Sequence, residues 1–139
     1  MTEEQARRRF AGATYAHLAS ADVRGRPHLV PLVFVLCGET IYSAVDAKPK
    51  RTRALRRLAN IAANPHVAVL VDHYSEDWDS LWWVRADGTG RVLDDDEAET
   101  RNALALLTAR YAQYRRQPPA GPVLAIDVER WSSWSASGD

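Results

Sequence analysis

The chain has 139 residues, enough for one domain with its own hydrophobic core. Its 18 basic and 18 acidic residues cancel to a formal net charge of zero, which argues against a general nucleic-acid binder, because such proteins carry an excess of positive charge. The first residues lack the apolar run of a signal peptide, and no stretch approaches the length of a membrane span. We therefore expect a cytoplasmic protein with neither a nucleic-acid nor a membrane partner.

The first third of the chain alternates short strand patterns with turns. Thr2 and Gln5 have the spacing of a capping box, which predicts a short N-terminal helix. A turn centred on Gly25 and a tight hairpin at 37–39 separate three expected strands: 14–21, 28–36 and 40–45. The run 28–36 is nearly continuous in apolar and β-branched residues, which predicts a strand buried on both faces, with Pro31 marking a bulge or an edge.

The rest of the chain predicts two longer helices and three further strands. One helix begins near Thr52 and ends before Pro65, and an amphipathic helix is expected at 94–114. The strands are expected at 66–72, 80–93 (broken by a glycine-containing bend) and 123–134. Six strands with few helices predict a mainly β, α+β fold: a small antiparallel barrel with helices outside it, in a single domain spanning 1–139 with a polar tail at 135–139.

The most unusual feature of the sequence is the basic segment "VDAKPKRTRALRRLANIAANP", which holds both lysines of the chain. Four of its cations precede or begin the expected helix: Lys48, Lys50, Arg51 and Arg53. The helix dipole disfavours exposed cations at this end by about 0.3–1 kcal/mol each, whereas the helix expected at 94–114 begins with acids, as the dipole prefers. A bound phosphate or carboxylate resolves the conflict, and Thr52 adds a hydroxyl donor. The alternatives are solvated charge or contact with acidic residues of a partner subunit.

Further along the same helix, the sequence predicts two opposite faces. The apolar face is expected to contain Leu55, Leu58, Ile61 and Ala62. The opposite face is expected to contain Arg53, Arg56, Arg57 and Asn60. We therefore expect Arg56 and Arg57 to face mostly solvent, while Arg51 and Arg53 hold the anion.

Five segments, taken in order, resemble a known family. They are "AHLAS", "RGRPHLVPLVFV", "GETIYSAVD", "KPKRTRALRRLANIAANPHVAVLVDHY" and "WWVRADGTGRV". They follow one another as in the pyridoxamine 5′-phosphate oxidase-like split β-barrels, which bind flavins and deazaflavins. Among the subgroups, the chain looks most like the actinobacterial branch that uses coenzyme F-420, a deazaflavin with a phospholactyl-polyglutamate tail.

The resemblance implies a six-stranded antiparallel split barrel that forms a homodimer, with the cofactor between the subunits. It implies that Arg51, Thr52 and Arg53 hold the cofactor phosphate, with Lys48 and Lys50 in reach of the phosphate or the glutamate tail. Relatives often carry lysine at the position of Arg51, and arginine offers a fork suited to two phosphate oxygens. The ring system is implied to lie against two strand segments: Val30, Pro31 and Leu32, and Tyr42 and Ser43.

Five tryptophans are many for this length. We expect Trp82 or Trp83 to pack into the core, because alternate residues of a strand face opposite sides. Trp78 lies in a polar loop and Trp131 near the end of the last strand, so either is a candidate to line the ring or substrate pocket. The alternative for both is packing in the core or in a dimer interface.

The sequence offers no catalytic residue. The four histidines have no metal-ligand spacing, and neither a nucleophile elbow nor a Cys–His pairing is present. Hydride transfer by a reduced deazaflavin requires no protein nucleophile, because the cofactor supplies the reactive atom. This absence is consistent with what the resemblance implies, an F-420-dependent oxidoreductase acting on a small conjugated or heteroaromatic substrate, and the basic residues beyond one phosphate favour that choice. The alternatives are an FMN-dependent oxidase or reductase and a non-catalytic protein that binds a flavin, a deazaflavin or a haem derivative.

Overall fold

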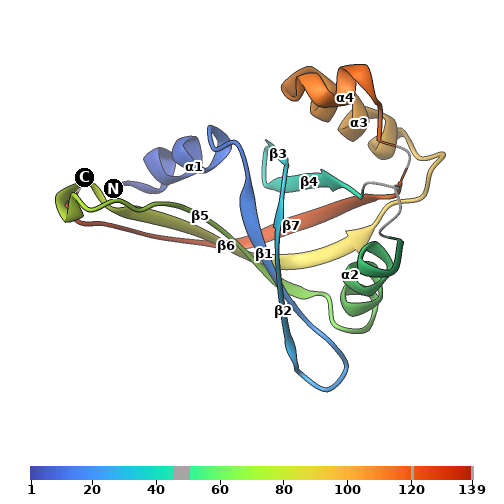
Figure 1. Cartoon of the computed structure of the whole chain (residues 1–139), viewed down its shortest axis with the longest axis horizontal. Helices are drawn as coiled ribbons and strands as arrows, with labels where there is room; N and C mark the ends of the chain where they lie inside the picture. The colour runs from blue at the N-terminus through green and yellow to red at the C-terminus, as the bar shows by residue number, and fades with distance from the viewer. Residues whose placement is uncertain (46–50, 120, 139) are drawn as a thin grey trace.

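The protein is a curled antiparallel sheet with helices packed around it, as a computed structural model shows (Figure 1). The structure describes residues 1–45, 51–119 and 121–138, and for 51–55 it describes the backbone alone. Seven strands are hydrogen-bonded in the order β2-β1-β5-β6-β7-β4-β3. The strands are β1 (Ala16–Ala21), β2 (Pro27–Leu32), β3 (Val35–Cys37), β4 (Thr40–Ala44), β5 (His66–His73), β6 (Trp82–Val92) and β7 (Val123–Ser135). The helices are α1 (Glu3–Ala11), α2 (Arg51–Ala63), α3 (Ala98–Arg110) and α4 (Ala112–Arg116), with a 3-10 turn, η1, at Trp78–Ser80.

The expected six strands are corrected to seven, because the apolar run 28–36 is not one strand. It divides into β2 and β3, and Val33 and Phe34 form the bend between them. The run is also not buried on both faces: β2 is an edge strand on which Pro27, Leu29 and Pro31 are exposed. An edge strand has a row of backbone groups without strand partners, which is why Pro31 is tolerated there.

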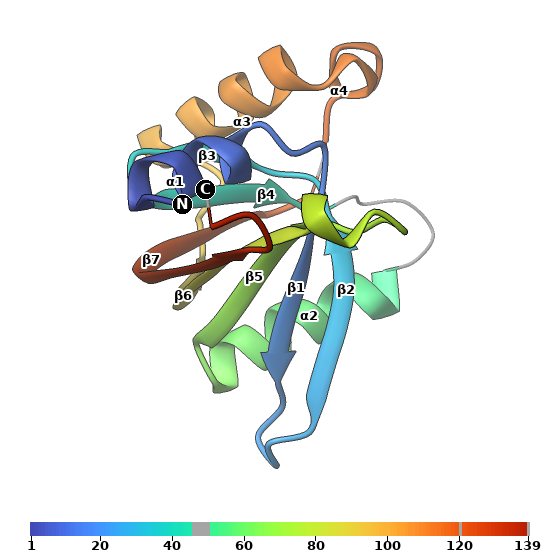
Figure 2. The ribbon, with the colours of Figure 1, turned by 90° about the vertical axis from the view of Figure 1, so that its left-hand side faces the viewer.

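The sheet curls until its two ends approach each other. In Figure 2 the strands fan around from β4 and β7 to β1 and β2. The Ser43 hydroxyl of β4 donates a hydrogen bond of 2.7 Å to the Val33 carbonyl, directly after β2. The long strands β6 and β7 change register between Asp87 and Gly88, and a bulge of this kind bends a strand pair. The bulge and the Ser43 contact together give a half-barrel.

The core fills the inside of this curl. Leu18, Val69 and Val84 are fully buried on neighbouring strands, and alternate residues of β1, β5 and β6 face inward. Phe10 of α1 packs against Phe34 with ring centroids 5.0 Å apart, so α1 covers one end of the barrel. The capping box predicted at Thr2 is confirmed, since its side chain accepts from the Gln5 amide and the Gln5 side chain accepts from the Thr2 amide.

The two predicted faces of α2 are partly wrong. Asn60 is only 7% exposed and Arg57 is half-buried, whereas Ala62 is exposed. The buried face is centred on Ile61, whose side chain approaches the backbone of Gly90 so closely that a side chain there would collide with it. Because this contact sets the rotation of the helix, two polar residues turn toward the barrel. Arg56 is exposed, as expected.

The helix expected at 94–114 is two helices. Residues 94–96 precede α3, and the chain breaks at Tyr111 between α3 and α4. The Tyr111 hydroxyl accepts a hydrogen bond from the Phe34 amide at 3.1 Å and lies 2.8 Å from the Phe34 carbonyl and 3.0 Å from the Thr14 carbonyl. This long-range contact, which local sequence does not encode, fixes the break.

Candidate functional site

The start of α2 differs from the starts of the two other long helices. α1 has Glu3 and Glu4 in its first turn and α3 has Glu99, whereas the first turn of α2 has no acidic residue. The backbone of Arg51, Thr52 and Arg53 forms that turn, and their side chains lie outside the description. Lys48 and Lys50 also lie outside the described residues. The prediction that these five residues hold a phosphate therefore rests on the helix start and on the sequence.

The structure brings together parts of the two strand segments predicted to face the cofactor ring. Leu32 is buried at the end of β2, Val30 is half-buried and Pro31 is exposed. Ser43 of β4 reaches this region through its hydrogen bond to the Val33 carbonyl, one residue beyond Leu32. Segments that lie near opposite edges of the sheet thus meet where the curl closes. Their contact with a ring stays a prediction.

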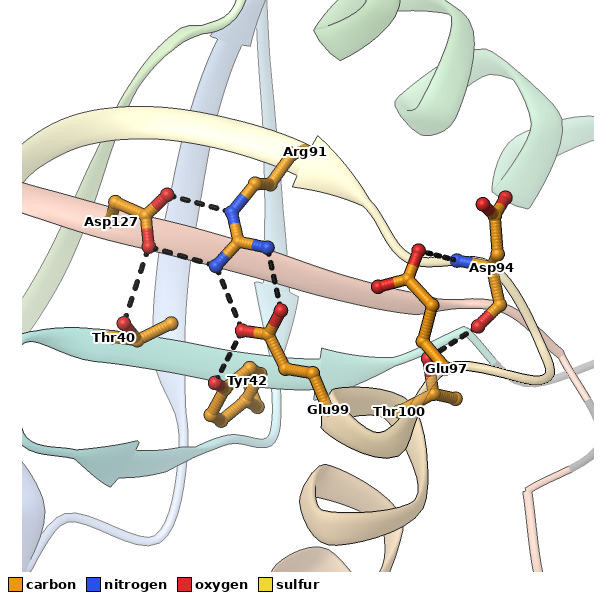
Figure 3. A network of polar contacts seen from close by, with 8 residues as sticks. All are labelled: Thr40, Tyr42, Arg91, Asp94, Glu97, Glu99, Thr100 and Asp127. Carbon is orange, nitrogen blue, oxygen red and sulfur yellow. Dashed lines mark hydrogen bonds and ion pairs between the residues drawn. The ribbon is translucent and has the colours of Figure 1, made fainter.

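Tyr42 points away from this meeting point, toward α3. Its ring packs with Leu93 and Ala103, and its hydroxyl donates a 2.6 Å hydrogen bond to Glu99 Oε2 (Figure 3). Burial, followed by the hydrogen bond to Glu99, raises the pKa of Tyr42 to about 12. The phenol is therefore protonated at neutral pH, with its hydrogen directed to a carboxylate.

Arg91 forms the centre of the network around Tyr42 (Figure 3). Its guanidinium donates to both oxygens of Glu99 at 2.7 and 2.8 Å and to both oxygens of Asp127 at 2.7 and 3.1 Å. Thr40 donates to Asp127 at 3.2 Å. The hydrogen bonds from Arg91 and Tyr42 lower the pKa of Glu99 to about 2, so this carboxylate does not act as an acid near neutral pH. The network joins α3 to β4, β6 and β7 and has a structural role.

Trp131 lies under α1. Its ring meets Phe10 edge-on with centroids 5.1 Å apart, and its indole nitrogen donates to Glu39 Oε2 at 3.1 Å. Arg7 stacks over the same ring, 5.7 Å from its centroid, and forms an ion pair with Glu39. These contacts within the chain favour the packing alternative for Trp131.

Trp78 lies far from the start of α2 within one chain. The β5–β6 connection that carries it lies where the two termini meet, since Leu81 accepts from the Ala136 amide and the N-terminal amine donates to the Gly138 carbonyl. α2 lies at the opposite end of the molecule (Figure 1). Trp78 is 71% exposed. A single chain therefore does not place Trp78 and the basic turn of α2 in one pocket.

An apolar groove, which the sequence did not predict, runs over the outward face of the sheet. We call it the tryptophan groove; its volume is about 630 Å³. Its main lining residues are Leu29, Leu70, Tyr74, Trp83, Arg85 and Trp134. Trp83 and Trp134 face each other across β6 and β7. Alternation along β6 was the signal in the sequence. Trp83 is next to the buried Val84 and Ala86 lies two residues further on, so Trp83 and its partner Trp134 must face outward.

The described part of the chain holds neither a cluster of metal-ligating side chains nor a helix of membrane-spanning character. Among those residues no group of three His, Cys, Asp or Glu side chains is placed to hold a metal ion. No described helix combines the length and the apolar character needed to cross a bilayer.

The fold defines an α+β protein built on a curled antiparallel half-barrel. The chain belongs to the pyridoxamine 5′-phosphate oxidase family, whose model matches residues 2–135. No protein of the curated set matches the sequence. The resemblance to this family is thereby confirmed, and the F-420 branch stays a prediction.

Solved structures with low sequence identity share the fold. The haem storage protein HutZ of Vibrio cholerae is 14% identical and superposes with a TM-score of 0.73 over 96% of this chain and 93% of that chain. An FAD-binding protein of Mesorhizobium loti is 20% identical, with a TM-score of 0.68 over 96% and 94% of the two chains. An FAD-binding protein of Mycobacterium smegmatis is 16% identical, with a TM-score of 0.61 over 96% and 94%.

Proposed function

We propose that this protein binds coenzyme F-420 and transfers a hydride between it and a small conjugated or heteroaromatic substrate. The observation that carries the proposal is the start of α2 in a member of the pyridoxamine 5′-phosphate oxidase family. There a helix begins with Arg51, Thr52 and Arg53 and has no first-turn acid, which suits an anion. The turn suits a phosphate because its backbone N–H groups and the helix dipole attract an anion, and its sequence adds the positive charge of two arginines.

The choice of F-420 over FMN rests on the number of cations. FMN has one phosphate, whereas F-420 adds a tail of several carboxylates. Lys48 and Lys50 extend the positive charge beyond what Arg51 and Arg53 need for one phosphate. Several cations close together in the sequence attract a ligand with several negative charges more strongly than a ligand with one phosphate.

The bound deazaflavin supplies the hydride, and the chain supplies orientation. The Ser43–Val33 hydrogen bond holds the backbone where β2 and β4 meet, against which the ring is proposed to lie. The Tyr42 hydroxyl donates its hydrogen to Glu99 and keeps it at neutral pH, so we assign Tyr42 the role of positioning β4. The proton donor to substrate is not assigned to a side chain.

The same proposal includes a homodimer formed through the outward face of the sheet. Leu29, Tyr74 and Trp134 line the tryptophan groove and are 68%, 75% and 45% exposed. A contiguous apolar face of this kind is typical of an interaction surface. Asp72 and Arg85 lie on the same face and have opposite charges, which suits a two-fold contact in which one patch meets its own copy.

A second candidate function is cofactor binding without catalysis. HutZ is a haem storage protein, and two other similar structures are FAD-binding proteins. The tryptophan groove, with its aromatic and apolar lining, is the feature that suits a large flat ligand such as haem. FMN remains the alternative cofactor for an oxidase or reductase.

Titration of the purified chain with F-420, FMN, FAD and haem tests these proposals. We expect F-420 to bind most tightly, and the chain with reduced F-420 to reduce a conjugated acceptor faster than reduced F-420 alone does. Tighter binding of FMN or FAD would overturn the choice of cofactor. Tight binding of haem, with no turnover of reduced F-420, would favour the second candidate.

A further inference from the structure

A polar cavity lies between the turn that joins β1 to β2 and the middle of α2. We call it the hairpin pocket; its volume is about 340 Å³. Its lining residues are Asp22, Arg24, Arg26, His28, Arg56 and Asn60, with Val23 and Pro27 at the turn. Figure 1 shows α2 beside the β1–β2 hairpin. This pocket is separate from the tryptophan groove, with which it shares no lining residue.

The turn that forms one wall of the pocket is held rigidly by its own aspartate. The Asp22 carboxylate accepts hydrogen bonds of 2.9 Å from the amides of both Arg24 and Arg26. Gly25 makes the turn possible, because its φ of 80° lies in the left-handed region that other residues avoid. The backbone that carries the two arginines is therefore fixed before any ligand arrives.

The pocket has a surplus of positive charge. Asp22 is the one carboxylate among its lining residues, against three guanidinium groups. Asp22 already accepts from two amides and lies 3.8 Å from Arg26 Nε. Within the described part of the chain, Arg24 and Arg56 form no ion pair. Arginines from the turn and from α2 thus line one cavity in which Asp22 is the single carboxylate.

Buried polar groups lie at or next to the pocket, and two of them lack a hydrogen-bond partner among the described residues. The two groups are Nδ1 of His28, which lines the pocket, and the hydroxyl of Ser20, which lies behind the lining. Asn60 is 7% exposed and lines the pocket, so its side-chain amide is available at the floor. Ser20 and His28 are direct neighbours across β1 and β2. Buried polar groups are nearly always hydrogen-bonded, so this cluster calls for a polar ligand or water.

We propose that the hairpin pocket binds the oxyanion group of a small molecule, a phosphate monoester, at a site distinct from the start of α2. Arginine presents a fork of donors that matches two oxygens of a phosphate, and the Asn60 amide adds a neutral donor at the floor. The volume exceeds that of one phosphate and is at the small end for organic ligands, which suits a phosphate on a small polar body. The site would therefore hold a second anionic molecule in addition to the proposed cofactor. This molecule is either a substrate or an effector.

The test uses the full chain without cofactor at constant ionic strength. Glycerol 3-phosphate, inorganic phosphate and succinate are titrated while the amide resonances of residues 22–28 and the side-chain amide of Asn60 are followed by NMR. We expect saturable shifts at these positions, with glycerol 3-phosphate binding more tightly than inorganic phosphate. Succinate binding as tightly as the phosphates would reassign the pocket to carboxylates and overturn the phosphate proposal. NMR shifts that depend on ionic strength alone would overturn the site, and so would an absence of shifts at residues 22–28. Water would then be the partner of the buried polar groups.

Two variants test the arginines. We expect Arg24→Ala, a change on an exposed turn, to weaken glycerol 3-phosphate binding roughly tenfold, and Arg24→Ala with Arg56→Ala to abolish it. Arg116→Ala, which removes an exposed arginine of α4, is the matched control and should change binding less than twofold. Equal weakening by Arg116→Ala would show a general charge effect and contradict the proposal. Displacement of glycerol 3-phosphate by F-420 would show that the two anions share one site, whereas failure of F-420 to bind leaves this test unaffected.

Discussion

The hydroxyl of Tyr42 and the carboxylate of Glu99 are joined by a 2.6 Å hydrogen bond that connects β4 to the first turn of α3. The same Glu99 oxygen accepts from Arg91 at 2.8 Å. Glu99 thus receives two charge-assisted contacts, which are stronger than neutral hydrogen bonds. Because one helix, α3, is held on the sheet by this carboxylate, its ionisation should be linked to the stability of the fold.

The pH dependence of stability should therefore depend on Glu99. Its pKa falls from 4.5 to about 2 on folding, so the contribution to stability is complete above about pH 4.5 and is lost as the pH falls toward 2. We expect Glu99→Gln to lower the free energy of unfolding by about 1 kcal/mol at pH 7 and by much less at pH 3, since the pair is partly exposed. Urea unfolding at both pH values measures the difference. Glu129→Gln, at an exposed position, is the control; an equal loss for Glu99→Gln at both pH values would contradict the linkage.

Tyr111 should stabilise the fold through its hydroxyl group. Replacing it by Phe keeps the ring but leaves the Phe34 amide, which donates to the hydroxyl at 3.1 Å, without that partner. Leaving a buried donor unpaired costs about 1–3 kcal/mol, so Tyr111→Phe should lower the free energy of unfolding by about that amount. Thermal or urea unfolding measures it. Tyr74→Phe, on a side chain that is 75% exposed, should change nothing, and an unchanged Tyr111→Phe would mean that the hydroxyl is not needed.

The parts of the fold that could be predicted are those whose causes are local. The capping box at Thr2, the left-handed Gly25 turn and the hairpin at Gly38 each depend on residues within a few positions of one another. The break of 28–36 into two strands could not be predicted. It depends on the Tyr111 hydroxyl and on the Ser43 contact, which come from distant parts of the chain.

The bulge at Gly88 should tolerate no side chain. A Cβ at this position would collide with the Asp127 carbonyl of the neighbouring strand. We expect Gly88→Ala to lower the free energy of unfolding by roughly 1–3 kcal/mol, because backbone on β7 must move to make room. Gly12→Ala is the matched control, since its Cβ would lie an ordinary 3.4 Å from the nearest atom. The two melting temperatures measure this, and equal values would show that the bulge adapts.

The candidate sites, too, include parts that could be predicted from the sequence and parts that could not. The cations before and within the first turn of α2 could be singled out because the helix dipole is a local property. The hairpin pocket could not, because the rotation of α2 is set by the approach of Ile61 to Gly90 on another strand. That rotation brings Asn60 to the floor of a cavity whose other wall is the turn at Asp22. The sequence predicted solvent at that face of the helix.

A substitution in the tryptophan groove tests whether the protein forms a homodimer through this face. We expect Trp134→Glu to produce a monomer by light scattering at micromolar concentration, because a charge placed in an apolar contact must be desolvated. Glu129→Gln, outside the groove, should leave the dimer intact. A wild-type chain that is already monomeric at this concentration would contradict the homodimer, and a dimer that survives Trp134→Glu would place the interface on another face.

The length of the cofactor tail should control affinity. Each added glutamate brings a carboxylate toward Lys48 and Lys50, so longer forms of F-420 should bind more tightly at low salt. Added salt should remove the gain, because exposed charges are screened beyond about 8–10 Å at physiological ionic strength. Titrations with short-tailed and long-tailed F-420 at two salt concentrations measure this. Equal affinity at low salt would leave the lysines unexplained and favour FMN.

Arg51 is proposed to bind the cofactor phosphate at the start of α2. Hydrogen bonds to a charged partner contribute about 1.5–3 kcal/mol, so Arg51→Ala should weaken F-420 binding roughly tenfold to a hundredfold. Arg116→Ala, an exposed arginine on α4, is the control and should change it little. The chain without cofactor should be as stable as wild type or slightly more stable, because a cation is removed from the positive end of a dipole. Affinity and melting temperature are measured side by side. Loss of binding with a lower melting temperature would indicate a structural role for Arg51, and normal binding would place the phosphate elsewhere on the chain.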